Sequence, residues 1–124
     1  MGEITPYLAT RDARSAIDWY VEHLGAEVVD DPIVMPDGRV GHVGLAVEGA
    51  RWMMSDEYPD LQVEAPAPGR GAAVTLHLAV GDVDRVVRSA VHGGADLDRG
   101  PEDTDHGRVA VLRDPFGHRW MVSG

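Results

Sequence analysis

The sequence predicts an α+β fold in which two tandem βαβββ modules form a curved mixed sheet, a cup, with the helices on its outer face. Three segments of the first half recur in the second half, in the same order, at offsets of 70, 69 and 68 residues. Such self-similarity at a nearly constant period indicates two copies of one unit of ~55 residues. The matched segments are Asp12-Ala13 with Asp82-Val83, residues 23–26 with 92–95, and residues 49–53 with 117–121.

The 124 residues form one domain, divided into module one (1–56), a connecting loop (57–72) and module two (73–124). The loop is rich in residues that break regular structure, and we expect none within it. A connection of this length is either a slack linker or a loop over a site. The residues that break it are Pro59, Pro66, Pro68, Gly69 and Gly71.

Module one begins with alternating apolar residues at 4–10, which predict a half-buried strand. Asp12 is a typical helix N-cap and Gly25 a typical stop, so a helix lies between them. Its apolar stripe is Ala13, Ile17, Tyr20 and Leu24, with Arg14, Asp18 and Glu22 on the solvated face. Three strands follow at about 26–30, 39–48 and 51–56, with Asp37-Gly38 as a turn.

Module two repeats this order. A strand at 74–80 leads to a helix capped by Asp82 and stopped by Gly93-Gly94. Strands near 96–99, 107–113 and 118–123 complete the copy, with a turn at 114–117 that has proline second and glycine fourth. The apolar helix positions are Val83, Val86, Val87, Ala90 and Val91.

Side chains alternate between the two faces of a strand, and this alternation separates a core from a second face. The core face packs under the helices, whereas the second face is mixed polar and apolar, as small-molecule sites are. Three interpretations remain open for it: the lining of a cup, a solvated sheet face, or a face buried in a dimer. The core set is Ile4, Leu8, Trp52, Met54, Leu76, Leu78, Trp120 and Val122. The second face carries Thr5, Tyr7, His42, Arg51, Met53, Ser55, Thr75, His77, Arg119 and Met121.

Composition excludes several classes of function. The absence of cysteine excludes disulfide scaffolds, thiol nucleophiles and cysteine-ligated zinc. With 11 cationic and 21 anionic side chains, the net charge of −10 disfavours nucleic acid as a partner. No apolar run reaches the ~20 residues of a membrane span, and no signal peptide opens the chain, so we expect a cytoplasmic protein with no membrane partner.

The chain resembles the glyoxalase/bleomycin-resistance/dioxygenase (vicinal oxygen chelate) superfamily, and within it the PhnB-like proteins. The resemblance spans the whole chain, and its last segment is the most specific. It implies paired βαβββ modules, a sheet enclosing a cavity, and a homodimer. The segments that carry it are residues 5–8, 16–20, 24–26, 55–59, 74–78 and 112–120.

Metal-dependent members of that superfamily hold a divalent ion through histidine or glutamate on the first and last strands of each module. Here those positions align with Thr5, Met53, Thr75 and Met121. None is a suitable ligand for Zn, Ni, Fe or Mn, so we expect no metal and no cofactor. His42 and His77 without a carboxylate are too few ligands to form a displaced site.

The predicted ligand-binding residues retain alternative roles. His77 is a weak catalytic candidate as a general base, and otherwise a ligand contact or a hydrogen-bonded strand residue. Tyr58 either stacks on a planar ligand or anchors its loop, and Arg51 and Arg119 either contact ligand or lie exposed at the sheet edge. The full predicted set is Thr5, Tyr7, His42, Met53, Ser55, Tyr58, Thr75, His77 and Met121.

Two main functions are compatible with these features. The first is a metal-free binding protein that sequesters a small molecule, as in antibiotic resistance. The second is a lyase, isomerase or dioxygenase that uses a metal or a histidine in the same cup. A PhnB-like housekeeping role is a third. The absent ligand set favours sequestration, and the acidic field with a methionine and tyrosine lining favours a neutral or cationic, partly aromatic natural product or drug. Open edge strands favour a symmetric homodimer.

Overall fold

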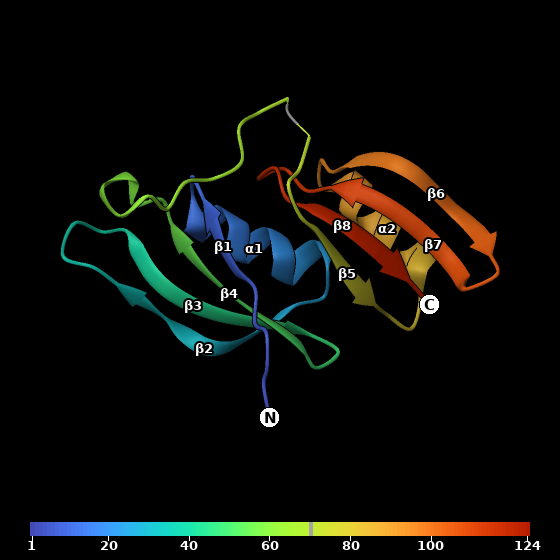
Figure 1. Cartoon of the computed structure of the whole chain (residues 1–124), viewed down its shortest axis with the longest axis horizontal. Helices are drawn as coiled ribbons and strands as arrows, with labels where there is room; N and C mark the ends of the chain where they lie inside the picture. Colours follow the sequence, from blue (N-terminus) through green and yellow to red (C-terminus); the bar gives the residue numbers. More distant parts are fainter. Residues whose placement is uncertain (70) are drawn as a thin grey trace. The chain divides into compact units, whose positions relative to one another are not determined.

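The computed structural model describes residues 1–69 and 71–124, and these divide into two compact units, Met1–Ala65 and Pro66–Gly124. Each unit contains one predicted module, and the βαβββ order occurs in both (Figure 1). Residue 70, inside the predicted loop, lies outside the described residues. Within the described ranges no helix is both long and apolar enough to cross a bilayer.

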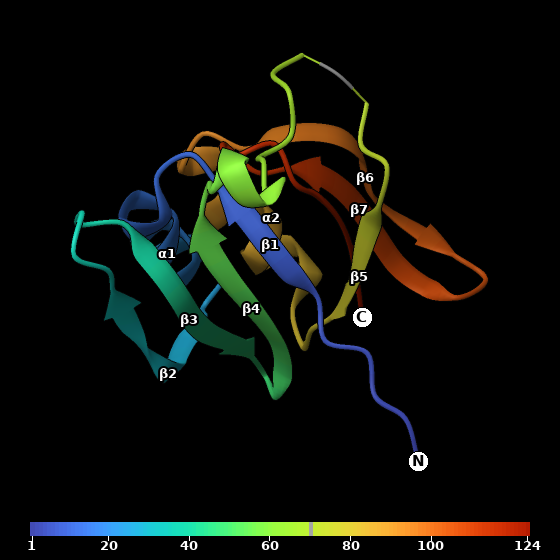
Figure 2. The same ribbon diagram turned by 60° about the vertical axis from the view of Figure 1, so that its left-hand side comes forward.

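Module one has one helix and four strands, followed by a short 3-10 helix. The strand order is β1-β4-β3-β2, with β4 between β1 and β3 (Figure 2). β1 and β4 are parallel, whereas β3 is antiparallel to both of its neighbours. The elements are β1 (Tyr7–Thr10), α1 (Ala13–His23), β2 (Glu27–Val34), β3 (Val40–Val47), β4 (Ala50–Asp56) and η1 (Pro59–Leu61).

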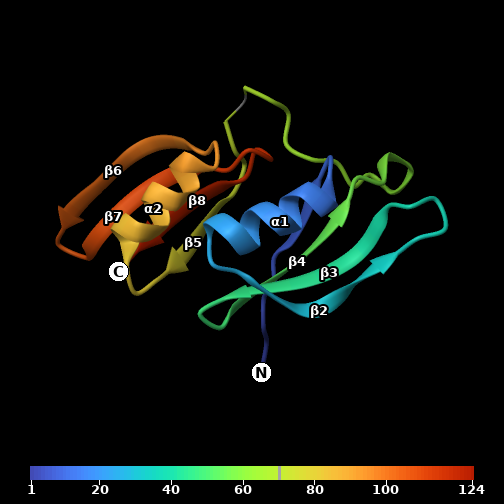
Figure 3. The ribbon, with the colours of Figure 1, turned by 180° about the vertical axis from the view of Figure 1, so that it is seen from behind.

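Module two has the same topology, in the order β5-β8-β7-β6, with β5 and β8 parallel. In each module the helix crosses one face of its own sheet (Figure 3). The predicted α+β fold of two βαβββ modules is therefore confirmed. The elements are β5 (Thr75–Ala79), α2 (Val83–His92), β6 (Asp96–Thr104), β7 (Gly107–Arg113) and β8 (Arg119–Ser123).

Both helices begin at the predicted aspartates. The Asp12 carboxylate accepts from the Ser15 N–H at 3.1 Å, and Asp82 accepts from the Arg85 N–H at the same distance. Beneath α1 the Tyr20 ring meets the Trp52 ring edge-on, at 5.4 Å between centroids. Of the predicted core set, Leu8, Trp52, Met54, Leu78, Trp120 and Val122 are buried.

Several sequence expectations were wrong. Ile4 is 95% exposed and β1 begins only at Tyr7, because Pro6 has no N–H to donate to the neighbouring strand. The loop contains η1, in which Pro59 occupies the first turn, where its missing N–H costs nothing. Val91, predicted on the apolar stripe of α2, is 43% exposed, because the buried side of that helix runs through Val83, Val87 and Ala90. Leu76, predicted in the core, is only half-buried.

The strands β2 and β6 extend beyond their predicted ends, to Val34 and Thr104. Both contain register shifts against their antiparallel neighbours. A bulge shifts side chains between faces, and so it hides a strand from any test based on alternation.

The turn at 114–117 depends on one buried carboxylate. Asp114 is 3% exposed and accepts hydrogen bonds from the N–H groups of Phe116 and His118, at 2.9 and 3.0 Å. It also accepts from the Trp120 indole at 2.8 Å, which fixes the largest aromatic side chain of the second core. The most specific segment of the family resemblance thus contains a carboxylate with a structural role.

Replacing Asp114 by alanine removes the acceptor shared by three donors, of which the Trp120 indole is buried and the two N–H groups are partly buried. We expect Asp114→Ala to lower the free energy of unfolding by about 2–4 kcal/mol, measured from urea denaturation midpoints. The matched control is Asp105→Ala in the exposed turn between β6 and β7, which should change stability by less than about 0.5 kcal/mol. Equal midpoints for the two variants would contradict this role of Asp114.

Candidate functional site

The sheet face opposite α1 carries the predicted residues of module one. In the register, Tyr7 on β1 lies beside Met53 on β4, and Met53 lies beside Gly44 on β3. Strand pairing therefore brings together residues that are far apart in the sequence. Because Gly44 has no side chain, the Asp30 side chain of β2 lies directly over β3 at this point of the row.

Tyr7 and His42 form the centre of this face. The Tyr7 hydroxyl lies 3.1 Å from the Gly41 carbonyl oxygen and 3.0 Å from His42 Nδ1, and the two rings meet edge-on at 5.7 Å. A phenol has one proton, so when it is donated to the carbonyl, His42 Nδ1 must carry the proton of the second bond. Tyr7 is 49% exposed, which leaves one side of its ring accessible to a ligand.

A bulge at Gly41 brings a second tyrosine to the same place. Register shifts from Ile33–His42 to Val34–Val40, leaving Gly41 as the extra residue of β3. A Cβ at Gly41 would lie 2.8 Å from Met35 Sδ and 3.6 Å from the Tyr58 hydroxyl, so a larger residue there would displace the end of the Met35 side chain. The bulge residue Gly41 thus lies beside the Met35 side chain and the Tyr58 hydroxyl, neither of which belongs to β3.

The Tyr58 hydroxyl is buried and has no hydrogen-bond partner among the described residues. One face of its ring is covered by the Arg39 guanidinium, 4.0 Å from the centroid, and its backbone pairs with Val63. Of the two roles considered for Tyr58, these contacts favour anchoring of the loop. Its hydroxyl still offers an unused donor beside Gly41.

Both arginines of the second face are engaged within their own sheets. Arg51 reaches across β3 to Asp30 at 2.9 Å, above Gly44. In module two, Arg119 donates to the Thr75 hydroxyl at 2.6 Å and lies 3.9 Å from Asp98. Each guanidinium therefore has a polar partner within its own sheet.

The second face of module two holds the other predicted residues. The register places His77 beside Met121 and Ala79 beside Ser123. His77 Nε2 lies 2.6 Å from Ser123 Oγ. Sequence reasoning missed Ser123, although the repeat offset of 68 relates it to the predicted Ser55.

Thr5 and Ser55 are poorly placed for a ligand. Thr5 precedes β1, where no strand forms, and is half-buried. Ser55 is 3% exposed and its hydroxyl donates to the Asp56 carbonyl oxygen at 2.9 Å. The residues that the structure brings together in module one are therefore Tyr7, His42, Met53 and Tyr58.

The four positions aligned with the family's metal ligands do not fit a divalent ion, because Thr5, Met53, Thr75 and Met121 offer neither imidazole nor carboxylate. Among the described residues no three histidine, aspartate or glutamate side chains lie close enough to hold a metal.

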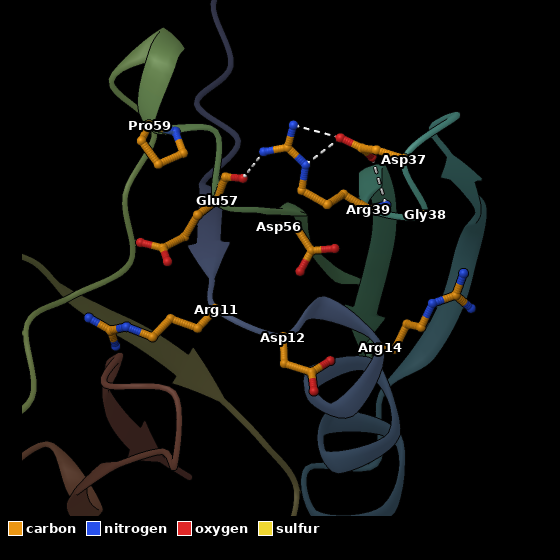
Figure 4. Close-up of a pocket in the computed structure, with 9 residues that line it drawn as sticks. All are labelled: Arg11, Asp12, Arg14, Asp37, Gly38, Arg39, Asp56, Glu57 and Pro59. Carbon is orange, nitrogen blue, oxygen red and sulfur yellow. Dashed lines mark hydrogen bonds and ion pairs between the residues drawn. The ribbon is translucent and has the colours of Figure 1, made fainter.

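A separate pocket of about 550 Å³ opens where β1 ends and α1 begins (Figure 4). Its carboxylates are engaged: Asp56 accepts from the N–H groups of Ala13 and Val40, and Asp37 pairs with Arg39 at 2.7 Å. Arg11 and Arg14 point to opposite sides (Figure 4). These hydrogen bonds and ion pairs hold the start of α1 and the β2–β3 turn in place. The polar groups of the pocket do not point toward a common centre where a ligand would be bound.

Comparison with known proteins gives one family. The model described as Glyoxalase/Bleomycin resistance protein/Dioxygenase superfamily matches residues 2–122. An uncharacterized protein of Mycobacterium bovis, Mb0911c, is 37% identical over 123 residues, which cover 96% of this chain and 80% of that protein.

Solved structures share the fold. TioX from Micromonospora sp. ML1 has a TM-score of 0.73 at 24% identity, covering 98% of this chain and 94% of that one. A PhnB protein from Bacillus cereus, described as a putative methyltransferase, has a TM-score of 0.71 at 16% identity, covering 98% of each chain. TnmS3 from Streptomyces sp. CB03234, an antibiotic binding protein, has a TM-score of 0.64 at 22% identity and covers 98% and 95% of the two chains.

The environment of Tyr7 predicts a change of stability at high pH. Burial of the hydroxyl, and next the negative charge of an ionised Tyr58, raise the pKa of Tyr7 above the ordinary value for tyrosine. The unfolded chain then loses this proton first, so the stabilisation is present below about pH 10 and is lost as the pH rises through the folded-state pKa. We expect the urea midpoint to fall less steeply between pH 9 and pH 11 in Tyr7→Phe than in the unmodified protein.

Tyr58→Phe is the matched comparison for Tyr7→Phe. At pH 8 the Tyr7 substitution removes the hydrogen bonds of the hydroxyl and should lower the free energy of unfolding by about 1 kcal/mol. The Tyr58 substitution removes a buried hydroxyl that has no partner among the described residues, and it should leave the free energy of unfolding unchanged or raise it. The reverse order of the two midpoints would show that the contacts at Gly41 are misassigned.

Proposed function

Because the chain belongs to the glyoxalase/bleomycin resistance protein/dioxygenase superfamily, we propose that it is a metal-free binding protein that sequesters a neutral or cationic, partly aromatic natural product or drug. The observation that carries this proposal is the face of module one, where Tyr7, His42 and Met53 lie together beside the buried Tyr58 hydroxyl. Such a face combines an aromatic ring, a soft thioether and a few placed polar groups.

The charge of the face supports the choice of ligand. Arg51 is paired with Asp30, so it does not draw an anion to Tyr7 and His42. The chain as a whole carries −10, which attracts cations and repels anions over a distance that salt shortens. An accessible tyrosine ring and the Met53 thioether suit a flat or polycyclic body.

The aligned positions on the first and last strands of both modules disfavour the metal-dependent reactions of the family, because Thr5, Met53, Thr75 and Met121 cannot form its ligand set. One structural neighbour, TnmS3, is described as an antibiotic binding protein, which is in keeping with sequestration in this fold. We infer that this role is carried out in the cytoplasm.

The binding prediction is tested with bleomycin, a cationic glycopeptide with a planar heteroaromatic tail, and with fosfomycin, a small phosphonate anion. Bleomycin is the first compound of a panel of cationic, partly aromatic antibiotics, and binding is measured by calorimetry in the presence of chelator. We expect bleomycin or another member of the panel to bind, and to bind more weakly at higher salt. Tyr7→Ala should raise the dissociation constant about tenfold, because an aromatic contact with the ligand is lost.

The control is Val91→Ala, on the exposed side of α2, which should leave the affinity unchanged. Binding of fosfomycin alone, a requirement for added metal, or an affinity insensitive to Tyr7→Ala would each overturn the proposed function.

We also propose a twofold-symmetric homodimer. The edge strand β2 exposes four large apolar side chains, which is a liability in an isolated monomer. Sedimentation at micromolar concentration should give a dimer, and Ile33→Glu should shift it to monomer, while Val91→Glu should not. A stable monomer of the unmodified chain would contradict this assembly. The exposed residues are Val28, Val29, Ile33 and Val34.

A further inference from the structure

We propose that Ser123 is a nucleophile, with His77 as its general base, for slow acyl transfer from activated esters. This pair lies in module two, uses none of the residues that carry the proposed binding site in module one, and goes beyond that function. The argument starts from the contact itself: His77 Nε2 and Ser123 Oγ are 2.6 Å apart. A hydroxyl within hydrogen-bond reach of an imidazole is the arrangement that activates serine.

The backbone holds this pair in place from both sides. Ala79 and Ser123 are neighbours in the parallel β5–β8 register, and the Ser123 carbonyl oxygen accepts from the Val80 N–H at 2.8 Å. The next residue, Gly124, exchanges two hydrogen bonds of 3.0 Å with Arg108. A nucleophile on a strand that is paired on both edges is positioned more firmly than one on a loop.

The surroundings suit a small ester. His77 is exposed and Ser123 is half-buried, so a reagent can approach the pair from solvent. Met121, which is half-buried, lies beside His77 in the register and offers the acyl group an apolar contact, whereas Val109 beside Ser123 is buried. The related Ser55 of module one is buried, and its hydroxyl donates to a backbone carbonyl instead of a histidine, so it is not activated.

The reaction balances without a metal or redox partner. The Ser123 oxygen forms a bond to the ester carbonyl carbon as its proton passes to His77 Nε2. The bond from that carbon to the leaving oxygen breaks, and the departing alcohol takes the proton from Nε2. Water then attacks the acyl carbon, gives a proton to Nε2, and the Ser123 oxygen leaves and recovers it. Among the described residues no carboxylate contacts the second ring nitrogen of His77, so we expect acylation slower than that of a full triad.

The experiment uses the full chain with p-nitrophenyl acetate and, separately, a fluorophosphonate, and intact-mass and peptide spectra locate the adduct. We expect one adduct per chain, on Ser123, absent in Ser123→Ala and formed at least tenfold more slowly in His77→Gln. Added imidazole should restore labelling of His77→Ala, because the side chain it replaces is exposed.

The matched control is Ser15→Ala, which removes an exposed hydroxyl bonded to the Asp12 carboxylate and should leave labelling unchanged. Circular dichroism of every variant separates loss of reactivity from loss of fold. Labelling that is spread over several serines, or a Ser123 adduct that forms equally fast in His77→Gln, would overturn the proposal. Bleomycin binding is measured on the same variants, so failure of acylation and failure of the proposed binding function are distinguished.

Discussion

The parallel pairing of the first strand of each module with its last is the constraint from which both candidate sites arise. Parallel neighbours need a long crossover, and here the helix and two further strands supply it. As a result Tyr7 stands beside Met53, and His77 beside Met121, although each pair is more than forty residues apart in the chain. The same pairing places the helix against the opposite face, where it completes the core. In each module the candidate site and the core therefore lie on opposite faces of the same sheet.

Carboxylates hold these sheets to their neighbours. Asp56, at the end of β4, accepts from the N–H groups of Ala13 and Val40, and so joins the start of α1 to the start of β3. Asp114 performs a comparable role around the Trp120 indole. Each carboxylate accepts hydrogen bonds from donors that burial would otherwise leave without partners. An acidic residue in a family motif can therefore have a structural role. A family resemblance carried by residues 112–120 therefore identifies a fold more securely than a reaction.

Much of the architecture follows from local signals in the sequence. The repeat, the two aspartate caps and the alternation of β4 and β8 predict the element order and most of the core. Prediction failed where backbone chemistry overrides pattern. Pro6 delays the start of β1, Pro59 starts a 3-10 helix, and bulges in β2 obscure its alternation beyond residue 30. In the candidate site, alternation alone placed Tyr7 and Met53 on one face. It could not place Tyr58 beside Gly41 or Ser123 beside His77, because those contacts depend on a bulge and on rotamers that no spacing encodes.

The aspartate–arginine pair of each sheet shows how far the two copies have diverged. In module one Gly44 lets Asp30 lie flat on β3 and meet Arg51 at 2.9 Å. The equivalent position of β7 is Val111, and there Asp98 and Arg119 are 3.9 Å apart, with Arg119 turned to Thr75 instead. Where the middle strand has glycine, the arginine pairs with the aspartate of the edge strand. Where it has valine, the arginine donates to the threonine of the first strand instead. The two modules thus share their order of elements, whereas the contacts of the corresponding arginines differ.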